Sequence, residues 1–196
     1  MLVVIGNGGH SRVVVAALLS RGIKVDLITR TPAEDAEVED MPGKPSIVIG
    51  IGNRATKAGP GMWARRALFE RFVKLGFVLP PVVHIGASER GLLRKGVQIM
   101  NRAVINPGAS IGENTLINTG AIVEHDCRVG RHCHIAPGAI LCGDVTIGDG
   151  THIGAGAVIL QGCTVGPGCV VPAGETVRFR HYEERASHDL HSPHRL

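Results

Sequence analysis

The sequence predicts two parts: a small α/β unit with a parallel sheet, followed by a parallel β-helix of short stacked strands. Three observations support this. Apolar runs alternate with helical patterns over residues 1–80, and aliphatic residues recur every six positions over residues 99–177. The composition agrees, because 27 glycines, 44% hydrophobic residues and only 3% aromatic residues describe a core of small and aliphatic side chains.

The first 80 residues contain the elements of a Rossmann-like domain. The apolar and helical patterns predict strands at 2–6, 23–29 and 47–51, and helices at 11–21 and about 60–75. Strands that alternate with helices favour a parallel sheet. The segment 31–45 is acidic and contains prolines, so we expect a surface loop there.

A glycine turn follows the first strand and precedes the first helix. Gly8, Gly9 and His10 lie in this turn, where backbone amides and a helix amino terminus can hold a phosphate or diphosphate. Ser11 stands where a dinucleotide-binding fingerprint has its third glycine, which disfavours NAD. A tight turn without any ligand remains the alternative.

A second glycine turn ends the third predicted strand and contains Gly52 and Asn53. Because the carboxyl ends of parallel strands meet at one edge of a sheet, the two turns are expected side by side. Together they predict a seat for a nucleotide sugar.

The carboxyl-terminal half is a hexapeptide repeat. The aliphatic series is Ile99, Ile105, Ile111, Ile117, Val123, Val129, Ile135, Leu141, Ile147, Ile153, Ile159, Val165, Val171 and Val177. Four positions after each member comes a residue that is nearly always small, and four of the five cysteines are among these residues. Each unit supplies one strand and one turn, and three units make a triangular coil of about 18 residues. We therefore expect both series inside the coil, with those cysteines as packing residues.

The repeat also sets the expected boundaries. A shift of two positions between Ile85 and Ile99 predicts an irregular first coil. We expect a nucleotide-sugar-binding domain at 1–80, a β-helix at 81–177 and a polar, partly disordered tail at 178–196.

His125 and Asp126 fall at a predicted turn of the β-helix, outside its packed interior. An imidazole suits removal of a proton near neutral pH, and a neighbouring carboxylate can orient it and support its charged form. The other histidines are more ambiguous. His134 and His152 should stack one coil apart, either as a coenzyme-lining column or as plain repetition, and His132 is expected in solvent.

The charge and the apolar segments of the sequence limit which binding partners and which cellular compartment are expected. The net charge of +4 comes from scattered basic residues, and the few aromatic residues argue against nucleic-acid binding. No run approaches the roughly 20 apolar residues that span a bilayer, and no basic segment precedes the first apolar run. We expect a cytoplasmic protein without membrane insertion, and the five cysteines fit a reducing compartment.

Four segments give the chain a family resemblance: GNGGHSRVV, IGIGN, VINPGASIG and, above all, INTGAIVEHDCRVG. In these segments the sequence resembles the sugar O- and N-acyltransferases of the sialic-acid and bacillosamine pathways, within the hexapeptide-repeat acyltransferases. The resemblance covers residues 1 to about 177. It implies a left-handed β-helix and a homotrimer with acetyl-CoA bound between adjacent subunits.

The resemblance also implies roles for individual residues. His125 would be the general base, Asp126 its carboxylate partner, and Asn118 a residue that orders the site. His134, Gly143 and Ala155 would face acetyl-CoA, with the Gly143 backbone as oxyanion donor. Gly8, Gly9, His10, Gly52 and Asn53 would hold the nucleotide sugar. Thr29 and Arg30 stand where family members commonly have an acidic pair.

The expected activity is transfer of an acetyl group from acetyl-CoA, as co-substrate and without a metal, to the amine of a UDP-4-amino-sugar-like acceptor. The first alternative is O-acetylation of a sialic-acid-like sugar. Two alternatives of other classes are a zinc-dependent carbonic anhydrase on the same repeat, which needs three converging histidines, and a β-helix scaffold without activity.

Overall fold

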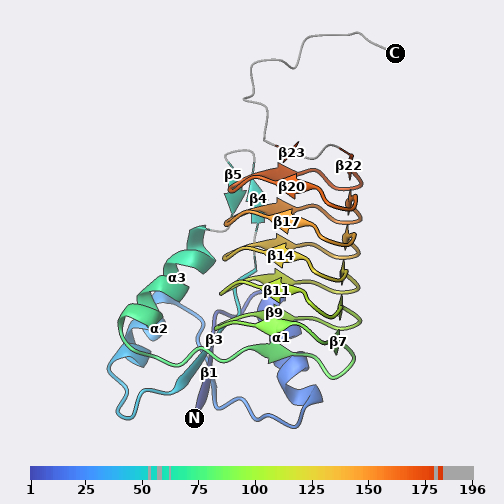
Figure 1. Ribbon diagram of the computed structural model, residues 1–196. Coiled ribbons are helices and arrows are strands. Elements are labelled where there is room, and N and C mark those ends of the chain that lie inside the picture. Colours follow the sequence, from blue (N-terminus) through green and yellow to red (C-terminus); the bar gives the residue numbers. More distant parts are fainter. Residues whose placement is uncertain (53, 57–58, 62, 179–180, 183–196) are drawn as a thin grey trace.

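The computed structural model describes residues 1–52, 54–56, 59–61, 63–178 and 181–182 and shows a triangular solenoid flanked at one end by a small α/β unit (Figure 1). No helix within these residues is both long and apolar enough to cross a membrane.

The α/β unit is built on a three-stranded parallel sheet of order β2-β1-β3. The strands are β1 (Leu2–Ile5), β2 (Leu27–Ile28) and β3 (Ser46–Ile49), the helices are α1 (Gly9–Ser20), α2 (Pro32–Glu39) and α3 (Trp63–Lys74), and β4 (Arg54–Thr56) pairs antiparallel with β5 (Gly59–Gly61). The parallel sheet between helices is as expected. It is smaller than a complete doubly wound fold, and β2 covers only two residues of the predicted strand at 23–29.

The segment 31–45 contains a helix, so the prediction of a surface loop was wrong. Thr31 caps α2, since its hydroxyl accepts a hydrogen bond from the Glu34 amide at 3.2 Å. Pro32 stands at the first helical position, where its missing N–H costs nothing. Val38 is buried against the sheet and anchors the helix. The proline that indicated a loop is a helix start.

The solenoid consists of two-residue strands joined by tight turns. They are β6 (Val82–Val83), β7 (Ser88–Glu89), β8 (Leu92–Leu93), β9 (Gln98–Ile99), β10 (Val104–Ile105), β11 (Ser110–Ile111), β12 (Leu116–Ile117), β13 (Ile122–Val123), β14 (Arg128–Val129), β15 (His134–Ile135), β16 (Ile140–Leu141), β17 (Thr146–Ile147), β18 (His152–Ile153), β19 (Val158–Ile159), β20 (Thr164–Val165), β21 (Val170–Val171), β22 (Thr176–Val177) and β23 (His181–Tyr182).

These strands form three parallel six-stranded sheets, the three faces of a prism. The β6 sheet has the order β21-β18-β15-β12-β9-β6, the β7 sheet β22-β19-β16-β13-β10-β7, and the β8 sheet β23-β20-β17-β14-β11-β8. The solenoid is left-handed. Strand β23 extends the last sheet into the predicted tail, and most of that tail lies outside the described residues.

The core of the prism confirms the repeat. Every member of the aliphatic series is buried, and so are the residues four positions after each member from Ile99 to Val165. The first coil is irregular, as the shift in the repeat predicted. Ser88 pairs with Val104 and Leu92 with Ser110, so the separation between stacked strands grows from 16 to 18 residues.

The small inward residues also donate hydrogen bonds when they are Thr or Cys. Thr115 Oγ1 donates to the Gly130 carbonyl at 2.8 Å, and Thr151 Oγ1 to the Gly166 carbonyl at 2.7 Å. Cys133 Sγ donates likewise to the Gly148 carbonyl at 3.1 Å. The inward cysteines are thus packing residues, as expected, and some of them also satisfy a turn carbonyl one coil away.

The α/β unit packs on the first coils of the prism. Val14 and Leu18 of α1 form one buried cluster with Val82, Met100 and Leu116, which lie on the β6 sheet or just after its strands. This contact fixes the glycine turn before α1 beside the same sheet.

Helix α3 covers a corner of the prism, which makes His132 a buried residue and the expectation of a solvated side chain wrong. The imidazole accepts or donates a hydrogen bond at 2.9 Å with Asn114 and lies edge-on to the Phe69 ring, with centroids 5.5 Å apart. Sequence spacing alone does not reveal which corner a helix covers.

Candidate active site

His125 and Asp126 form a hydrogen-bonded pair at an exposed corner of the prism, in the turn between β13 and β14. His125 Nδ1 lies 2.8 Å from Asp126 Oδ2, and the side chains are 56% and 62% exposed. Because a carboxylate only accepts, Nδ1 carries the shared proton, and Nε2 keeps a lone pair to which no described residue donates a hydrogen bond. The hydrogen bond to Asp126 raises the pKa of His125 above its ordinary value.

The neighbouring coils leave room for this pair. A Cβ added at Gly143, one coil further along, would lie 2.6 Å from His125 Nε2, and a Cβ at Gly108, one coil earlier, would collide with the Asp126 carboxylate. The imidazole therefore lies over the bare Gly143 backbone. The Gly143 N–H has no hydrogen-bond partner within the described residues, so it can donate to a ligand.

Glu124 is a second acidic group at this corner, and its role was not predicted from the sequence. Its Oε2 accepts a hydrogen bond from Asn106 Nδ2 at 2.7 Å. Its charge also contributes to the raised pKa of His125, after Asp126. The signal in the sequence is its position next to His125.

Asn118 and His134 form a second pair at a different part of the prism. Asn118 Oδ1 accepts from the Thr119 amide at 2.8 Å, so its Nδ2 faces His134 Nε2 at 3.1 Å. The ring must then accept at Nε2 and carry its proton on Nδ1. That Nδ1 is buried and has no partner among the described residues, so the pair holds one unused donor.

His134 and His152 stack one coil apart, as expected. His134 and His152 occupy paired positions of β15 and β18, with ring centroids 4.8 Å apart. Burial, followed by the charges of His152, His10 and Arg65, lowers the pKa of His134 to about 3. His134 is therefore neutral at physiological pH.

The predicted residues fall into two groups on separate parts of the prism. His125, Asp126 and Gly143 lie in turns that lead from the β7 sheet to the β8 sheet. His134 lies on the β6 sheet, and Asn118 and Ala155 lie in turns that lead from that sheet to the β7 sheet. Within the described residues, no hydrogen bond joins the two groups.

The glycine turn before α1 is held by polar contacts. The Gly6 amide donates to Thr29 Oγ1 at 3.0 Å, and Ser11 Oγ donates to the Gly8 carbonyl at 2.6 Å. Gly8 caps α1 without a side-chain partner. Thr29 and Ser11, which departed from the expected motifs, thus shape the turn itself.

The second glycine turn lies against the first. A Cβ at Gly52 would lie 3.1 Å from His10 Cβ, and a Cβ at Gly50 would lie 2.8 Å from Ser11 Cβ. The structure therefore brings the two turns together as predicted. Asn53 lies outside the described residues.

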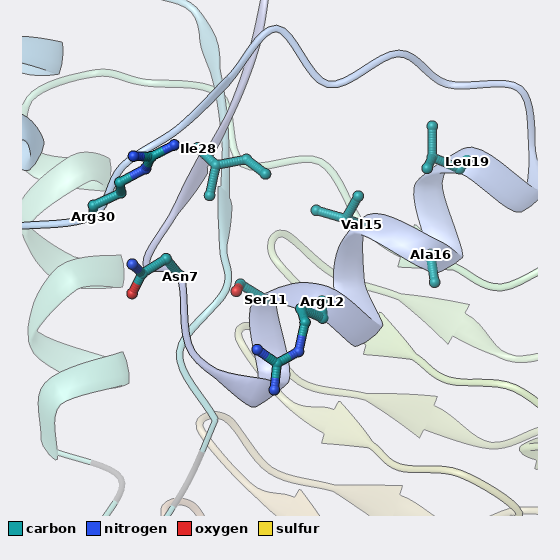
Figure 2. A pocket seen from close by; sticks show the side chains of 8 residues that line it. All are labelled: Asn7, Ser11, Arg12, Val15, Ala16, Leu19, Ile28 and Arg30. Carbon is teal, nitrogen blue, oxygen red and sulfur yellow. The ribbon is translucent and has the colours of Figure 1, made fainter.

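An open pocket of ≈ 440 Å³ lies beside the glycine turn (Figure 2). Its lining residues are Asn7, Ser11, Arg12, Val15, Ala16, Leu19, Ile28 and Arg30. Figure 2 shows Val15, Ala16 and Leu19 along the helical wall, with Asn7 between the guanidinium groups of Arg12 and Arg30. The apolar wall can contact the flat face of a ring, and the two guanidinium groups can contact negatively charged groups of the same ligand. Sequence analysis did not select Arg12, because basic residues on helices are common.

No group of three or more His, Cys, Asp or Glu side chains in the described part of the chain could hold a metal ion.

Comparisons with known proteins place these sites in context. A family model described as bacterial transferase hexapeptide (six repeats) matches residues 108–143 and 144–174. The acetyltransferase domain of PglB from Neisseria gonorrhoeae is 30% identical, with a TM-score of 0.81 over 90% of each chain. A further structure of that domain holds acetyl coenzyme A.

A second relative is PerB from Caulobacter crescentus, in complex with CoA and GDP-perosamine. It is 31% identical with a TM-score of 0.82, and the alignment covers 90% of this chain and 88% of that one. A histidine-to-alanine variant of GDP-perosamine N-acetyltransferase from the same organism, also with CoA and GDP-perosamine, matches with 31% identity, the same coverage and a TM-score of 0.80.

Proposed function

The chain belongs to the hexapeptide-repeat sugar acetyltransferases, and on that premise we propose that it transfers the acetyl group of acetyl-CoA to the amine of a nucleotide-linked amino sugar. The relatives with at least 30% identity over most of their length are acetyltransferases, and one of them holds CoA together with a GDP sugar. We propose an acceptor of the UDP-4-amino-sugar type, with the GDP-linked class as the second candidate.

The observation that carries the mechanism is the free Nε2 lone pair of His125. Asp126 holds the proton on Nδ1 and supports the positive charge that develops on the ring. The amine nitrogen attacks the thioester carbonyl carbon, Nε2 takes the amine proton, and the C–S bond then breaks to release CoA as the thiolate. The thiolate regains a proton from the imidazolium or from solvent.

Gly143 is proposed to stabilise the oxyanion of this reaction. Its amide has no hydrogen-bond partner in the described part of the chain, and its backbone lies against the His125 ring. A backbone donor aimed at the position of developing charge lowers the barrier without reorganisation. No acyl-cysteine is required, and burial raises the pKa of Cys127 to about 11, which makes that nearby thiol a poor nucleophile.

We propose that each site is completed by two subunits of a homotrimer. His125 and His134 project from different parts of one prism, so a single chain does not bring them to one reacting centre. Packing one prism against the next places a corner of one subunit against a face of its neighbour. The unused Nδ1 donor of His134 would then serve the acetyl-CoA bound in the groove.

The amino-terminal unit is the proposed seat of the nucleotide sugar. The paired glycine turns offer backbone amides and the amino terminus of α1 to a diphosphate. The pocket lined by Arg12 and Arg30 would take the nucleoside end.

The test is CoA release in the presence of UDP-, GDP-, CMP- and dTDP-linked amino sugars and of free sialic acids. We expect turnover with a nucleotide-linked amine, and His125→Ala should reduce kcat roughly 100-fold or more while the thermal midpoint is kept. Turnover with sialic acids alone would establish O-acetylation instead. Full activity of the His125→Ala variant would remove the mechanism.

A further inference from the structure

We infer that Gln98 positions His10 so that its Nδ1 accepts a hydrogen bond from a hydroxyl group of the nucleotide sugar, rather than binding a phosphate. The inference deepens the proposed function and rests on it. Gln98 belongs to strand β9 of the β-helix, and His10 belongs to helix α1 beside the proposed nucleotide-sugar site.

The orientation of the Gln98 amide is fixed by its partners. Gln98 Nε2 lies 2.8 Å from the Ile49 carbonyl oxygen, which can only accept, so this atom is the NH₂ group. The Oε1 atom consequently faces the other way, 2.8 Å from His10 Nε2 and 3.2 Å from Arg65 Nη1. Gln98 is 1% exposed, so no solvent competes for either end.

This orientation determines the tautomer of His10. An amide oxygen only accepts, hence His10 Nε2 must carry the proton that it donates to Gln98 Oε1. The lone pair of the neutral ring is then on Nδ1, and no described residue forms a hydrogen bond with it. His10 presents an acceptor, although it lies in the first turn of a helix where anions are usually bound.

Arg65 also holds the Gln98 amide in place, since its Nη1 donates a hydrogen bond to Gln98 Oε1. Its guanidinium is fully buried and donates to the Ile49, Ile51 and Gly96 carbonyls as well as to Gln98. No carboxylate of the described residues lies within ion-pair distance of it. A buried cation held only by neutral acceptors is costly, which argues for a role beyond packing.

The charged and titratable groups around His10 favour its neutral form. Burial, with the charge of Arg65 from α3, lowers the pKa of His10 to about 4, even though the Gln98 hydrogen bond acts in the opposite direction. His134 of β15, which interacts electrostatically with His10, is also neutral at physiological pH. His10 therefore offers a lone pair at any pH where the enzyme is assayed.

The position of that lone pair identifies its partner. His10 Nδ1 lies 3.8 Å from where a Cβ would stand at Gly52, between the two glycine turns of the proposed seat. A lone pair repels phosphate oxygens, which have no proton to give. It attracts a hydroxyl of the ribose or of the sugar, and the diphosphate is left to the backbone amides.

The first experiment reads the tautomer directly. Nitrogen-15 NMR of the wild-type protein with labelled histidine should show His10 protonated on Nε2 and unprotonated on Nδ1 from pH 6 to 8. Assignment uses a His10→Asn variant, in which only that signal disappears. Protonation on Nδ1, or a cationic ring in that range, would overturn the inference.

The second experiment uses the full-length enzyme with a Gln98→Glu variant. A carboxylate beside His10 raises the pKa of the ring, so the lone pair is lost as the pH falls. The KM for the nucleotide sugar should rise about 10-fold between pH 8 and pH 6, as expected for one lost hydrogen bond, while the KM for acetyl-CoA changes less than about 2-fold. In the wild type the KM for the nucleotide sugar should show no such rise.

Asn101→Asp makes the same amide-to-acid change at an exposed turn three residues away and should leave both KM values unaltered. A Gln98→Glu variant whose KM for the nucleotide sugar has the wild-type pH profile would contradict the inference. Failure of the wild type to turn over any nucleotide sugar is a different result. It would refute the proposed function and the hydroxyl assignment, and the nitrogen shifts would still decide whether Gln98 sets the tautomer.

Discussion

The candidate base depends on backbone conformations that few residues adopt. Asp126 has a positive φ of 61°, which turns its carboxylate back toward the imidazole of the preceding residue. Asp and Asn are the non-glycine residues that tolerate this region best. One residue thus both makes the corner of the prism and orients His125.

The carboxylate of Asp126 predicts a defined pH dependence. In the proposed mechanism the neutral imidazole of His125 is the active form. Asp126 raises the pKa of this ring, so activity should be lost as the pH falls through that raised value. Asp126→Asn removes the cause, and the acidic limb of kcat/KM should move to lower pH while the plateau falls roughly 10- to 100-fold. The measurement is a pH–rate profile of both proteins, and an unmoved limb would show that Asp126 does not govern the titrating group.

The absence of a side chain at Gly143 leaves room for the His125 ring, and a Gly143→Ala variant tests this. A Cβ there would displace the His125 ring, so Gly143→Ala should lower kcat about 10- to 100-fold. The ring is exposed and can swing aside, hence the thermal midpoint should hardly change. In a double-mutant cycle, adding Gly143→Ala to His125→Ala should cause little further loss. Additive losses would mean that Gly143 acts independently of His125.

The elements of the β-helix were predictable because their pattern is local. Inward positions such as Ile135 and Cys133 follow from a six-residue period, whatever lies outside the prism. The burial of His132 and Arg65 was not predictable, since it depends on which corner α3 covers. Helix α2 was missed because a proline at a helix start looks like a loop signal in isolation.

Some small inward residues donate a hydrogen bond to a turn carbonyl besides packing in the core, and Thr151 is one of them. Thr151→Val keeps the shape but leaves the Gly166 carbonyl without its donor, which should cost about 1–3 kcal/mol. Thr151→Cys copies Cys133, the equivalent residue one coil earlier, and should be the milder change. Thermal midpoints at equal protein concentration compare the two. A Val variant as stable as the wild type would show that the inward hydrogen bond contributes nothing.

At the scale of the whole molecule, the prism separates His125 and His134, which the proposed mechanism needs at one reacting centre. Sequence motifs marked both His125 and His134 but did not reveal that they lie on different parts of one chain. The network of Gln98, Arg65 and His10 also exists only at this scale, because it joins residues 88 positions apart. No local pattern could have indicated it.

The most direct test of a shared site is subunit mixing. His125→Ala and His134→Ala variants are each expected to be nearly inactive, but in a ring of three that contains both, one of the three interfaces receives His125 from one subunit and His134 from the next. Random co-assembly should therefore restore about one quarter of the wild-type activity per subunit. A mixture that forms hybrid trimers and yet stays as inactive as its parents would contradict the account.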